Sequence, residues 1–384
     1  MKNKIYLDYA ATTPVAPEVL EAMLPFFSEG WGNASAVYAT GREARRAVED
    51  ARKAVAVSIG AQPQEICFTS GGSESDNTAI CGTARALREK GKHIITTAIE
   101  HHAVLNPCKQ LQKEGFEITY VRPDQEGRID PEEIRKAIRP DTILVSVMTA
   151  NNEIGTIEPV GEIGQICKEN GIVFHTDAVQ AIGTVPLNVE ETGCDLLSLS
   201  AHKFYGPKGV GALYIREGTR LNPLITGGEQ ERGLRAGTEN VPGIVGLGKA
   251  IMLAGKGIEQ HTADMRRMRD RITEGILSSI PGTALNGSKE NRLPNNCSFR
   301  FDGIDGEALL LRLDLAGIAA SAGSACTAGS RETSHVLKAV GLTEAEAKSS
   351  LRLTTGIHTT EEETDETVKI IGEIVKDLRR IQFI

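Results

Sequence analysis

The sequence lacks the features that would place a protein outside the cell or in a membrane. Its seven cysteines include no C-x-x-C pair, so neither a disulfide framework nor a structural zinc site is expected. No apolar run is long enough to span a bilayer. The first four residues lead directly into a strand-like segment without the apolar region of a secretory signal, and we therefore expect a cytoplasmic protein without membrane contact.

The common nucleotide-binding motifs are also missing. There is no G-x-x-x-x-G-K-[ST] loop, and Gly246-Leu-Gly248 is followed by Ile251 where a dinucleotide-binding turn has its third glycine. Positive charge is scarce, with 43 lysines and arginines against 51 aspartates and glutamates, a net charge of −8. Because phosphate backbones are bound by clustered basic residues, a nucleic acid is not expected as a direct partner.

What the sequence does contain is a regular alternation of strands and helices. Strands are predicted at 66–70, 93–98, 116–121, 142–148, 172–176, 195–200 and 210–215, and helices at 17–27 and 42–59. Seven strands, most of them joined by helical connections, imply an α/β fold with a largely parallel sheet covered on both faces. The last two strands are too close for a helix between them, so one strand should run antiparallel.

A chain of 384 residues is long enough for one large core and a second, smaller one. The sheet pattern stops near residue 257. A strand at 295–301, a helix at 306–315 and a final helix opened by a capping box at Thr360-Glu-Glu-Glu363 follow. We therefore expect a large domain over 15–257 and a smaller α+β domain formed by 1–14 and 258–384.

The segment Ser200-Ala-His-Lys203 directly follows the apolar strand at 195–200. In open α/β sheets ligands bind at the carboxyl ends of the strands, which is where Lys203 would lie. A lone lysine in such a place is most often a surface residue. The polar residues that follow the other strands therefore decide its interpretation.

Two of these strands end in candidate ligand-binding groups. Gly71-Gly72-Ser73 opens a helix after the first strand, and it offers backbone N–H groups and a hydroxyl to a phosphate. His101 and His102 follow the second strand. Adjacent side chains at a helix start point apart, so we expect no shared metal and at most one of the two histidines facing the site.

Two further strands end in amide and acid groups. Asn151 follows the fourth strand, and Asp177-Ala-Val-Gln180 follows the fifth. Alone, Asp177 could be a helix cap, but with Gln180 three residues later both side chains can face one ligand. A lysine, a carboxylate, a phosphate cradle and a histidine at one sheet edge are the components of a pyridoxal 5′-phosphate (PLP) site.

Several motifs, in the same order along nearly the whole chain, resemble those of the cysteine desulfurases of the NifS and IscS type. They are TSGGSESDN at 69–77, EH at 100–101, NNEIGT at 151–156, DAVQ at 177–180, SAHK at 200–203, GPKGVG at 206–211, RAGTEN at 235–240 and SAGSACT at 321–327. The resemblance implies a homodimeric PLP enzyme of fold type I, like aspartate aminotransferase. Such an enzyme converts L-cysteine to L-alanine and holds the sulfur as a persulfide on its own cysteine. A sulfur-acceptor protein, either an iron–sulfur scaffold or a tRNA-thiolation enzyme, then receives it.

The resemblance also implies a role for each matching residue. Lys203 would hold PLP through a Schiff base, Asp177 would pair with the ring nitrogen, and His101 would lie over the ring and assist proton transfer. The remaining cofactor contacts would come from Gly72, Ser73, Asn151, Gln180, Ser200, His202 and, for the other subunit, Thr238. Arg352 would bind the substrate carboxylate, a task that suits its planar fork, with Asn151 nearby.

Cys326 is the candidate persulfide carrier. It lies in a run of small residues, 321–330, with glycines at 323 and 329, which predicts a mobile loop. The other six cysteines are expected to be small buried hydrophobes. Two alternatives stay open: an aminotransferase or another lyase of the same fold, which needs no loop cysteine, and a non-catalytic sulfur carrier, which uses Cys326 alone.

Overall fold

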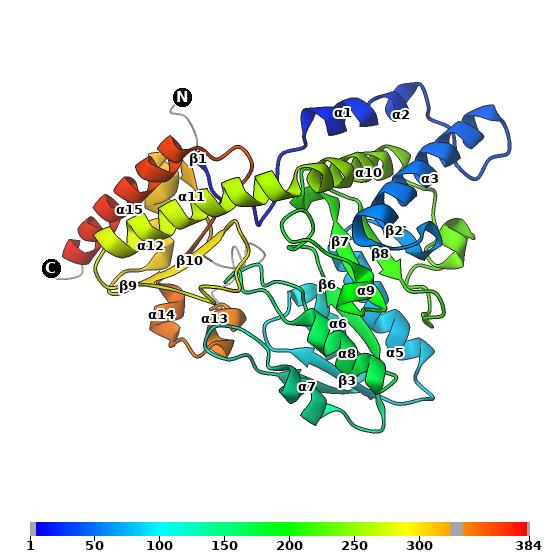
Figure 1. The fold of residues 1–384 in the computed structure, drawn as a ribbon, viewed down its shortest axis with the longest axis horizontal. Helices are drawn as coiled ribbons and strands as arrows, with labels where there is room; N and C mark the ends of the chain where they lie inside the picture. Colours follow the sequence, from blue (N-terminus) through cyan, green and yellow to red (C-terminus); the bar gives the residue numbers. More distant parts are fainter. Residues whose placement is uncertain (1–4, 323–332, 382–384) are drawn as a thin grey trace.

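The computed structural model describes residues 5–322 and 333–381, and a seven-stranded sheet forms the centre of its larger part (Figure 1). The strand order is β2-β8-β7-β6-β5-β3-β4. The strands are β2 (Ile66–Thr69), β3 (His93–Thr97), β4 (Glu117–Val121), β5 (Thr142–Ser146), β6 (Val173–Asp177), β7 (Leu196–Ser200) and β8 (Gly211–Ile215). β8 pairs antiparallel with β2 and β7, whereas the other neighbours pair parallel. The predicted fold class is confirmed.

Helices cover both faces of this sheet, which explains why its central strands are continuous apolar runs. Successive side chains alternate between the faces: Ile95 and Val145 join the core under α3 (Ala39–Ile59), α8 (Val160–Glu169) and α10 (Val241–Lys256), while Ile94 and Leu144 join the core under α6 (His102–Lys113). The other helical segments of this part are η1 (Pro63–Glu65), α4 (Gly72–Asn77), η2 (Thr78–Gly82), α5 (Thr83–Ala86), α7 (Pro131–Ala137), α9 (Val189–Thr192), η3 (Ala201–Lys203) and η4 (Gln230–Gly233).

The helix predicted at 17–27 is wrong in one respect, because the structure has two helices there, α1 (Pro17–Met23) and α2 (Pro25–Ser28). Pro25 has no N–H to donate and its ring crowds the preceding turn, so the first helix ends before it. The helix predicted at 42–59 is present as α3, which begins three residues earlier.

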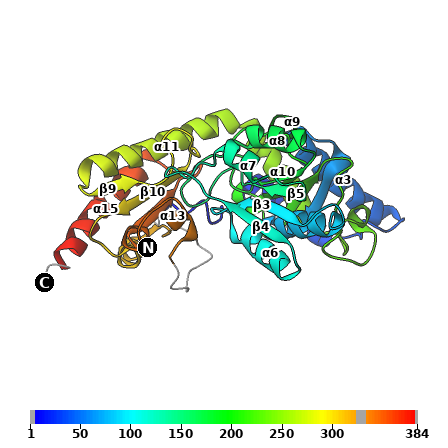
Figure 2. The same cartoon turned by 90° about the horizontal axis from the view of Figure 1, so that it is seen from below.

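A second, three-stranded antiparallel sheet has the order β12-β10-β9 and its own apolar core. Figure 2 shows this sheet and its helices at one end of the molecule and the seven-stranded sheet at the other. Its elements are α11 (Ile258–Ser279), β9 (Thr283–Leu285), β10 (Asn296–Phe301), α12 (Gly306–Ala316), α13 (His335–Ala339), α14 (Glu344–Lys348), β12 (Ser350–Thr354) and α15 (Glu361–Ile381). The predicted capping box of α15 is confirmed by reciprocal hydrogen bonds between Thr360 and Glu363.

The amino-terminal segment connects the two sheets. β1 (Ile5–Tyr6) pairs parallel with β11 (Ile318–Ala319), and Asp8 forms an isolated bridge with Thr354 at the end of β12. Five residues later, the N–H of Thr13 donates to the carbonyl of His202 at 2.9 Å. Residues 8–13 therefore run from the second sheet to the end of β7.

α10 and α11 meet at Gly257 with a bend of 75° between their axes. In the described part of the chain no single helix is long and apolar enough to cross a membrane. This bent pair reaches the required length and composition only when its two helices are taken together.

Candidate active site

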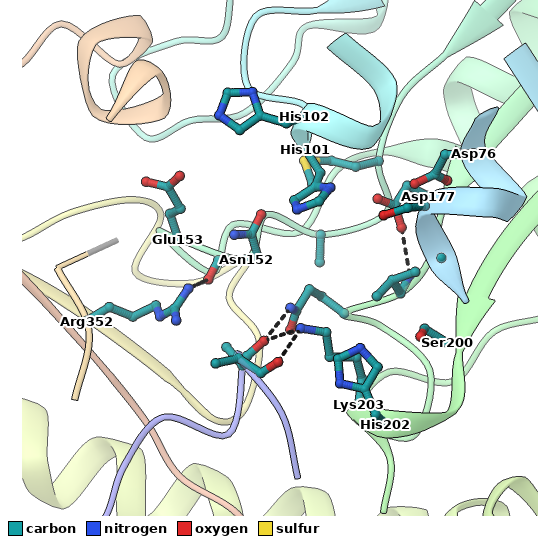
Figure 3. Close-up of a pocket in the computed structure, with 18 of the residues that line it drawn as sticks. Asp76, His101, His102, Asn152, Glu153, Asp177, Ser200, His202, Lys203 and Arg352 are labelled. Atoms are coloured by element: carbon teal, nitrogen blue, oxygen red, sulfur yellow. Dashed lines mark hydrogen bonds between the residues drawn. The ribbon is translucent and has the colours of Figure 1, made fainter. Parts of the chain in front are cut away.

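A cavity of about 230 Å³ lies where β2, β6 and β7 end, between the two sheets (Figure 3). Most of the site residues predicted from the sequence line it, namely Gly72, Ser73, His101, Asp177, Gln180, Ser200, His202, Lys203 and Arg352. The strand ends bring together residues that are far apart in the chain, since the carboxyl ends of parallel strands meet at one edge of a sheet.

Lys203 enters this cavity from η3, the short turn that follows β7. Its Nζ donates hydrogen bonds to the carbonyls of Ala10 and Ala11, at 2.6 and 2.9 Å. Gln180 donates to the same Ala10 carbonyl at 3.0 Å. The amino-terminal segment therefore fixes the position of the lysine amine, although Lys203 and Ala10 are 193 residues apart.

Asp177 is the last residue of β6, and its carboxyl is buried. Its Oδ1 accepts a hydrogen bond from the N–H of Val179 at 2.9 Å. Burial raises the pKa of Asp177, whereas the Val179 N–H and the charge on Lys203 lower it. Asp177 is therefore held in a place where a positive partner inside the cavity would stabilise its ionised form.

The glycine-rich turn between β2 and α4 brings the backbone close to β7. Gly71 has φ = 150°, a conformation that favours glycine, and a Cβ on Gly72 would lie 2.7 Å from Cγ2 of Val179. Ser73, in the first turn of α4, and Ser200, at the end of β7, line the cavity here. The Nδ1 of His202 lies 3.1 Å from the hydroxyl of Thr12.

Both His101 and His102 line the cavity, so the prediction that at most one of them would face it is wrong. His101 is the N-cap of α6 with extended backbone angles, and the two side chains are therefore not successive helical positions. The Nδ1 of His101 accepts the N–H of Ala103 at 3.1 Å. Burial and the charge on Lys203 lower the pKa of His101 to about 4, so its ring is neutral at pH 7.

Arg352 reaches the cavity from β12, and its side chain is 2% exposed. One guanidinium nitrogen, Nη2, donates to Oδ1 of Asp8 at 2.7 Å, and Nη1 donates to the carbonyl of Asn152 at 2.9 Å. The Nε of Arg352 has no hydrogen-bond partner among the described residues. The backbone of Arg352 pairs with Ser321, which directly precedes the segment containing Cys326.

Two predicted site residues, Asn151 and Thr238, do not line the cavity, and the structure does not describe a third. The side chain of Asn151 is fully buried and bonded to backbone groups of Ile99, Glu153 and Ile154. Thr238 is exposed in the loop before α10. Cys326 lies outside the described residues, while the other six cysteines are buried as predicted.

The structure also adds residues that the sequence did not indicate. Asp76 of α4 is 1% exposed and lines the cavity close to Asp177. On the opposite wall, Glu153 accepts a hydrogen bond from the hydroxyl of Ser334, and the ring of His335 lies 4.8 Å from that of His102. In the sequence, site residues were indicated by polar groups at the ends of strands. Asp76, Glu153 and His335 come instead from helices and a loop, where no such pattern marks them.

Comparisons with known proteins agree with this arrangement. The model of the family "Aminotransferase class-V" matches residues 5–366. "Cysteine desulfurase IscS" of Dictyoglomus turgidum is 55% identical over 381 residues, which cover 99% of this chain and 97% of that protein. Two solved structures are also similar. "NIFS-LIKE PROTEIN" has a TM-score of 0.92, 41% identity and coverage of 98% and 100%, and "SspA in complex with cysteine" has a TM-score of 0.82, 40% identity and coverage of 93% and 100%.

The groups in the cavity fit the cofactor of this family. A lysine amine, a buried carboxylate and a hydroxyl-lined turn where a Gly72 Cβ would clash are the donor set that PLP requires. The buried Nε of Arg352 and Oδ1 of Asp76, which have no hydrogen-bond partner among the described residues, leave polar atoms for a ligand or a proton. The chain therefore belongs to the class-V aminotransferase family and, within it, to the PLP-dependent cysteine desulfurases of the NifS and IscS type.

Proposed function

We propose that this enzyme converts L-cysteine to L-alanine and holds the sulfur as a persulfide on Cys326 until an acceptor takes it. The observation that carries the proposal is the placement of an amine, Lys203, and a carboxylate-binding group, Arg352, on the walls of one cavity. An amino-acid substrate presents an amine, which would take the place of Lys203 on the cofactor, and a carboxylate, which Arg352 would bind. A relative that is named for this reaction, and that the chain matches over 97% of its length, supports the proposal.

PLP, when bound, supplies an electron sink for the bonds at the substrate Cα. The chain would hold it through Lys203, with the ionised Asp177 at the ring nitrogen. Phosphate contacts would come from Gly72, Ser73, Ser200 and His202, ring-oxygen contacts from Gln180 with Asn151 behind it, and the contact to the other subunit's phosphate from Thr238. The role of Asn151 would be to hold the loop that carries Asn152 and Glu153, because its amide is bonded to that backbone.

His101 would donate a hydrogen bond toward the cavity and assist proton transfer there. Its Nδ1 accepts the Ala103 N–H, so the neutral ring carries its hydrogen on Nε2. The low pKa of His101 keeps the ring neutral at pH 7, so its Nε2–H would donate a hydrogen bond into the cavity. To assist proton transfer, the ring would release a proton from Nε2 only as it takes one up at Nδ1. Lys203 Nζ, held by the two carbonyls of Ala10 and Ala11, would move protons at the substrate Cα.

We further propose a homodimer in the cytoplasm, with each chain divided into a large domain over 15–257 and a small domain of 1–14 plus 258–384. The second apolar core and the bend at Gly257 support the division, and Val336, Leu337, Val340 and Ala347 of the small domain pack against the large core. Arg235, paired with Glu74 of α4 at 2.9 Å, fixes the loop that ends at the exposed Thr238, which would then reach the second subunit. The acceptor would be an iron–sulfur scaffold or a tRNA-thiolation protein.

Replacement of Cys326 by alanine tests this function. The variant should bind PLP and L-cysteine, because Lys203, Asp177 and Arg352 are unchanged, and should form neither L-alanine nor protein-bound persulfide. A matched control is Cys81→Ala, which removes a buried thiol from an apolar cluster and should retain both products. Alanine release by Cys326→Ala at the wild-type rate would favour a lyase without a persulfide. A purified protein that binds no PLP would favour the sulfur-carrier alternative.

A further inference from the structure

Asp76 is a buried acid for which the proposed reaction has no role. It lies one helical turn after Gly72, is 1% exposed and lines the same cavity as Asp177. Figure 3 shows the two carboxyl groups next to each other. The Oδ1 of Asp76 has no hydrogen-bond partner among residues 5–322 and 333–381. Its distance of 3.6 Å to Nε2 of His175 is too long for a good hydrogen bond.

His175 supplies no positive charge to this acid. It is fully buried on β6, with Nδ1 2.8 Å from the hydroxyl of Ser146 and Nε2 3.0 Å from the hydroxyl of Ser198. Burial lowers the pKa of His175 to about 3, so the ring is neutral. Burial and the charge of Asp177 raise the pKa of Asp76, and they outweigh the hydroxyl of Ser198, which lowers it.

The other charged groups around the pair make the two acids unequal. Glu100, which follows β3, would repel an anion on Asp76 only when it is ionised, and burial raises its own pKa to about 8, while the charge on Lys203 lowers the pKa of Asp177. His101 and His102 line the cavity at the start of α6. The remaining titratable side chains on the buried faces of η2, α6, β2 and β8 lie in apolar clusters, and they are Cys81, Cys108, Cys67 and Tyr214.

Two adjacent buried carboxylates cannot both be ionised without a large repulsion, and such a pair holds one proton between them. Asp177 has a backbone N–H and the Lys203 charge to stabilise an anion. Burial and the charge of Asp177 both act against an anion on Asp76. We propose that Asp76 and Asp177 share one proton near neutral pH, and that this proton resides on Asp76 and leaves the negative charge on Asp177.

Asp76 is then a positioning residue. It keeps the proton away from Asp177, so that Asp177 remains the anion opposite the cofactor's ring nitrogen. This second step rests on the proposed role of Asp177, whereas the location of the proton does not. The proton can therefore be tested without substrate and without turnover.

Infrared difference spectroscopy of the full-length enzyme with bound PLP, recorded over a pH series in H₂O and D₂O, tests the location of the proton. Asp76→Asn should remove one deuterium-sensitive band of a protonated carboxyl that is present in the wild type near pH 7. In Asp177→Asn the same band should remain and should titrate at lower pH, because the neighbouring negative charge is gone. A role of Asp76 in packing alone would not produce this shift.

Glu158→Gln is the matched control. Glu158 is another buried acid with a raised pKa, but the charges acting on it come from Arg128 and Asp124, so its band should not move in Asp177→Asn. Loss of an ionised-carboxylate band in Asp76→Asn, or an Asp76 band whose titration is the same in Asp177→Asn, would overturn the proposal. If Asp76→Asn does not fold, isotope-labelled aspartate in the wild type and in Asp177→Asn identifies the same band. Failure of sulfur release, by contrast, would change none of these spectra.

Discussion

Arg352→Lys isolates the proposed recognition of the substrate carboxylate. Lysine keeps the positive charge, but it replaces a planar fork with a single ammonium group. In the structure, Nη2 of Arg352 binds Asp8 and Nη1 binds the carbonyl of Asn152. An ammonium group in the same place can retain a contact with Asp8, but it cannot hold that contact and also present two parallel N–H groups to a substrate.

The expected effect is the loss of one charge-assisted hydrogen bond to the carboxylate. Such a bond contributes about 1.5–3 kcal/mol, which corresponds to a rise in KM for L-cysteine of roughly 10- to 150-fold. The rate at saturating substrate should fall less than kcat/KM, since the carboxylate contact is made in the ground state as well as in the transition state. L-alanine, which has the same carboxylate, should lose affinity as an inhibitor by a similar factor.

The measurement is steady-state alanine formation over a range of L-cysteine concentrations, together with inhibition by cysteamine, which has no carboxylate. Inhibition by cysteamine should be nearly equal in the wild type and in Arg352→Lys. Arg292→Lys is the control, because Arg292 is also buried but is bonded to the Ser288 carbonyl and to Asn296, away from the cavity. An unchanged KM for L-cysteine in Arg352→Lys would refute the proposed role of Arg352.

Three further outcomes are expected. Lys203→Ala should abolish turnover and retain the wild-type circular dichroism spectrum, because Lys203 is proposed to hold the cofactor and is not part of either core. Turnover close to that of the wild type would contradict the assignment. Arg52→Met should lower the free energy of unfolding by about 3–5 kcal/mol, because Glu231, bonded at 2.7 and 2.8 Å, would stay buried without its partner. In urea titrations the double variant with Glu231→Gln should recover part of this loss, and a single variant as stable as the wild type would show that the pair contributes little. Burial raises the pKa of Glu158 to about 8, so unfolding between about pH 5 and pH 8 releases its proton. In that pH range the wild type should lose up to about 1.4 kcal/mol of stability per pH unit relative to Glu158→Gln. Parallel pH profiles of the two proteins would show that Glu158 is ionised in the fold.

The types and approximate positions of the strands followed from local pattern, but their order in the sheet did not. Only ten residues separate the end of β7 from the start of β8, which allowed an antiparallel pair to be predicted, since no covering helix fits between them. β3 lies between β5 and β4 in the sheet, and no local feature of His93–Thr97 indicates these neighbours. Strand order depends on contacts between distant segments, which short-range periodicity does not contain.

The site shows the same limit at the level of single residues. Lys203 and Asp177 could be predicted because each directly follows or ends a strand. The partner of Arg352 could not, because Asp8 is 344 residues away in the sequence. Asp76 lies within a polar helical stretch, where no strand end marks it as a site residue. Its spacing of four residues from Gly72 puts both on one helix face, and that pattern could have placed it at the site.

Several buried polar atoms in and around the cavity lack hydrogen-bond partners among the described residues. Among the described residues, Oδ1 of Asp76, Oε2 of Glu100 and Nε of Arg352 are buried and unpaired, and the residues carrying them lie in or next to one cavity. Each such group costs about 1–3 kcal/mol if it stays unpaired, so a fold that serves stability alone would avoid gathering them. A proton can satisfy the two acids, whereas the Nε–H of Arg352 requires an acceptor. Neutral Asp76 and Glu100 would leave the negative charge on Asp177, and Nε of Arg352, whose Nη2 already binds Asp8, would stay available for the carboxylate of an amino acid.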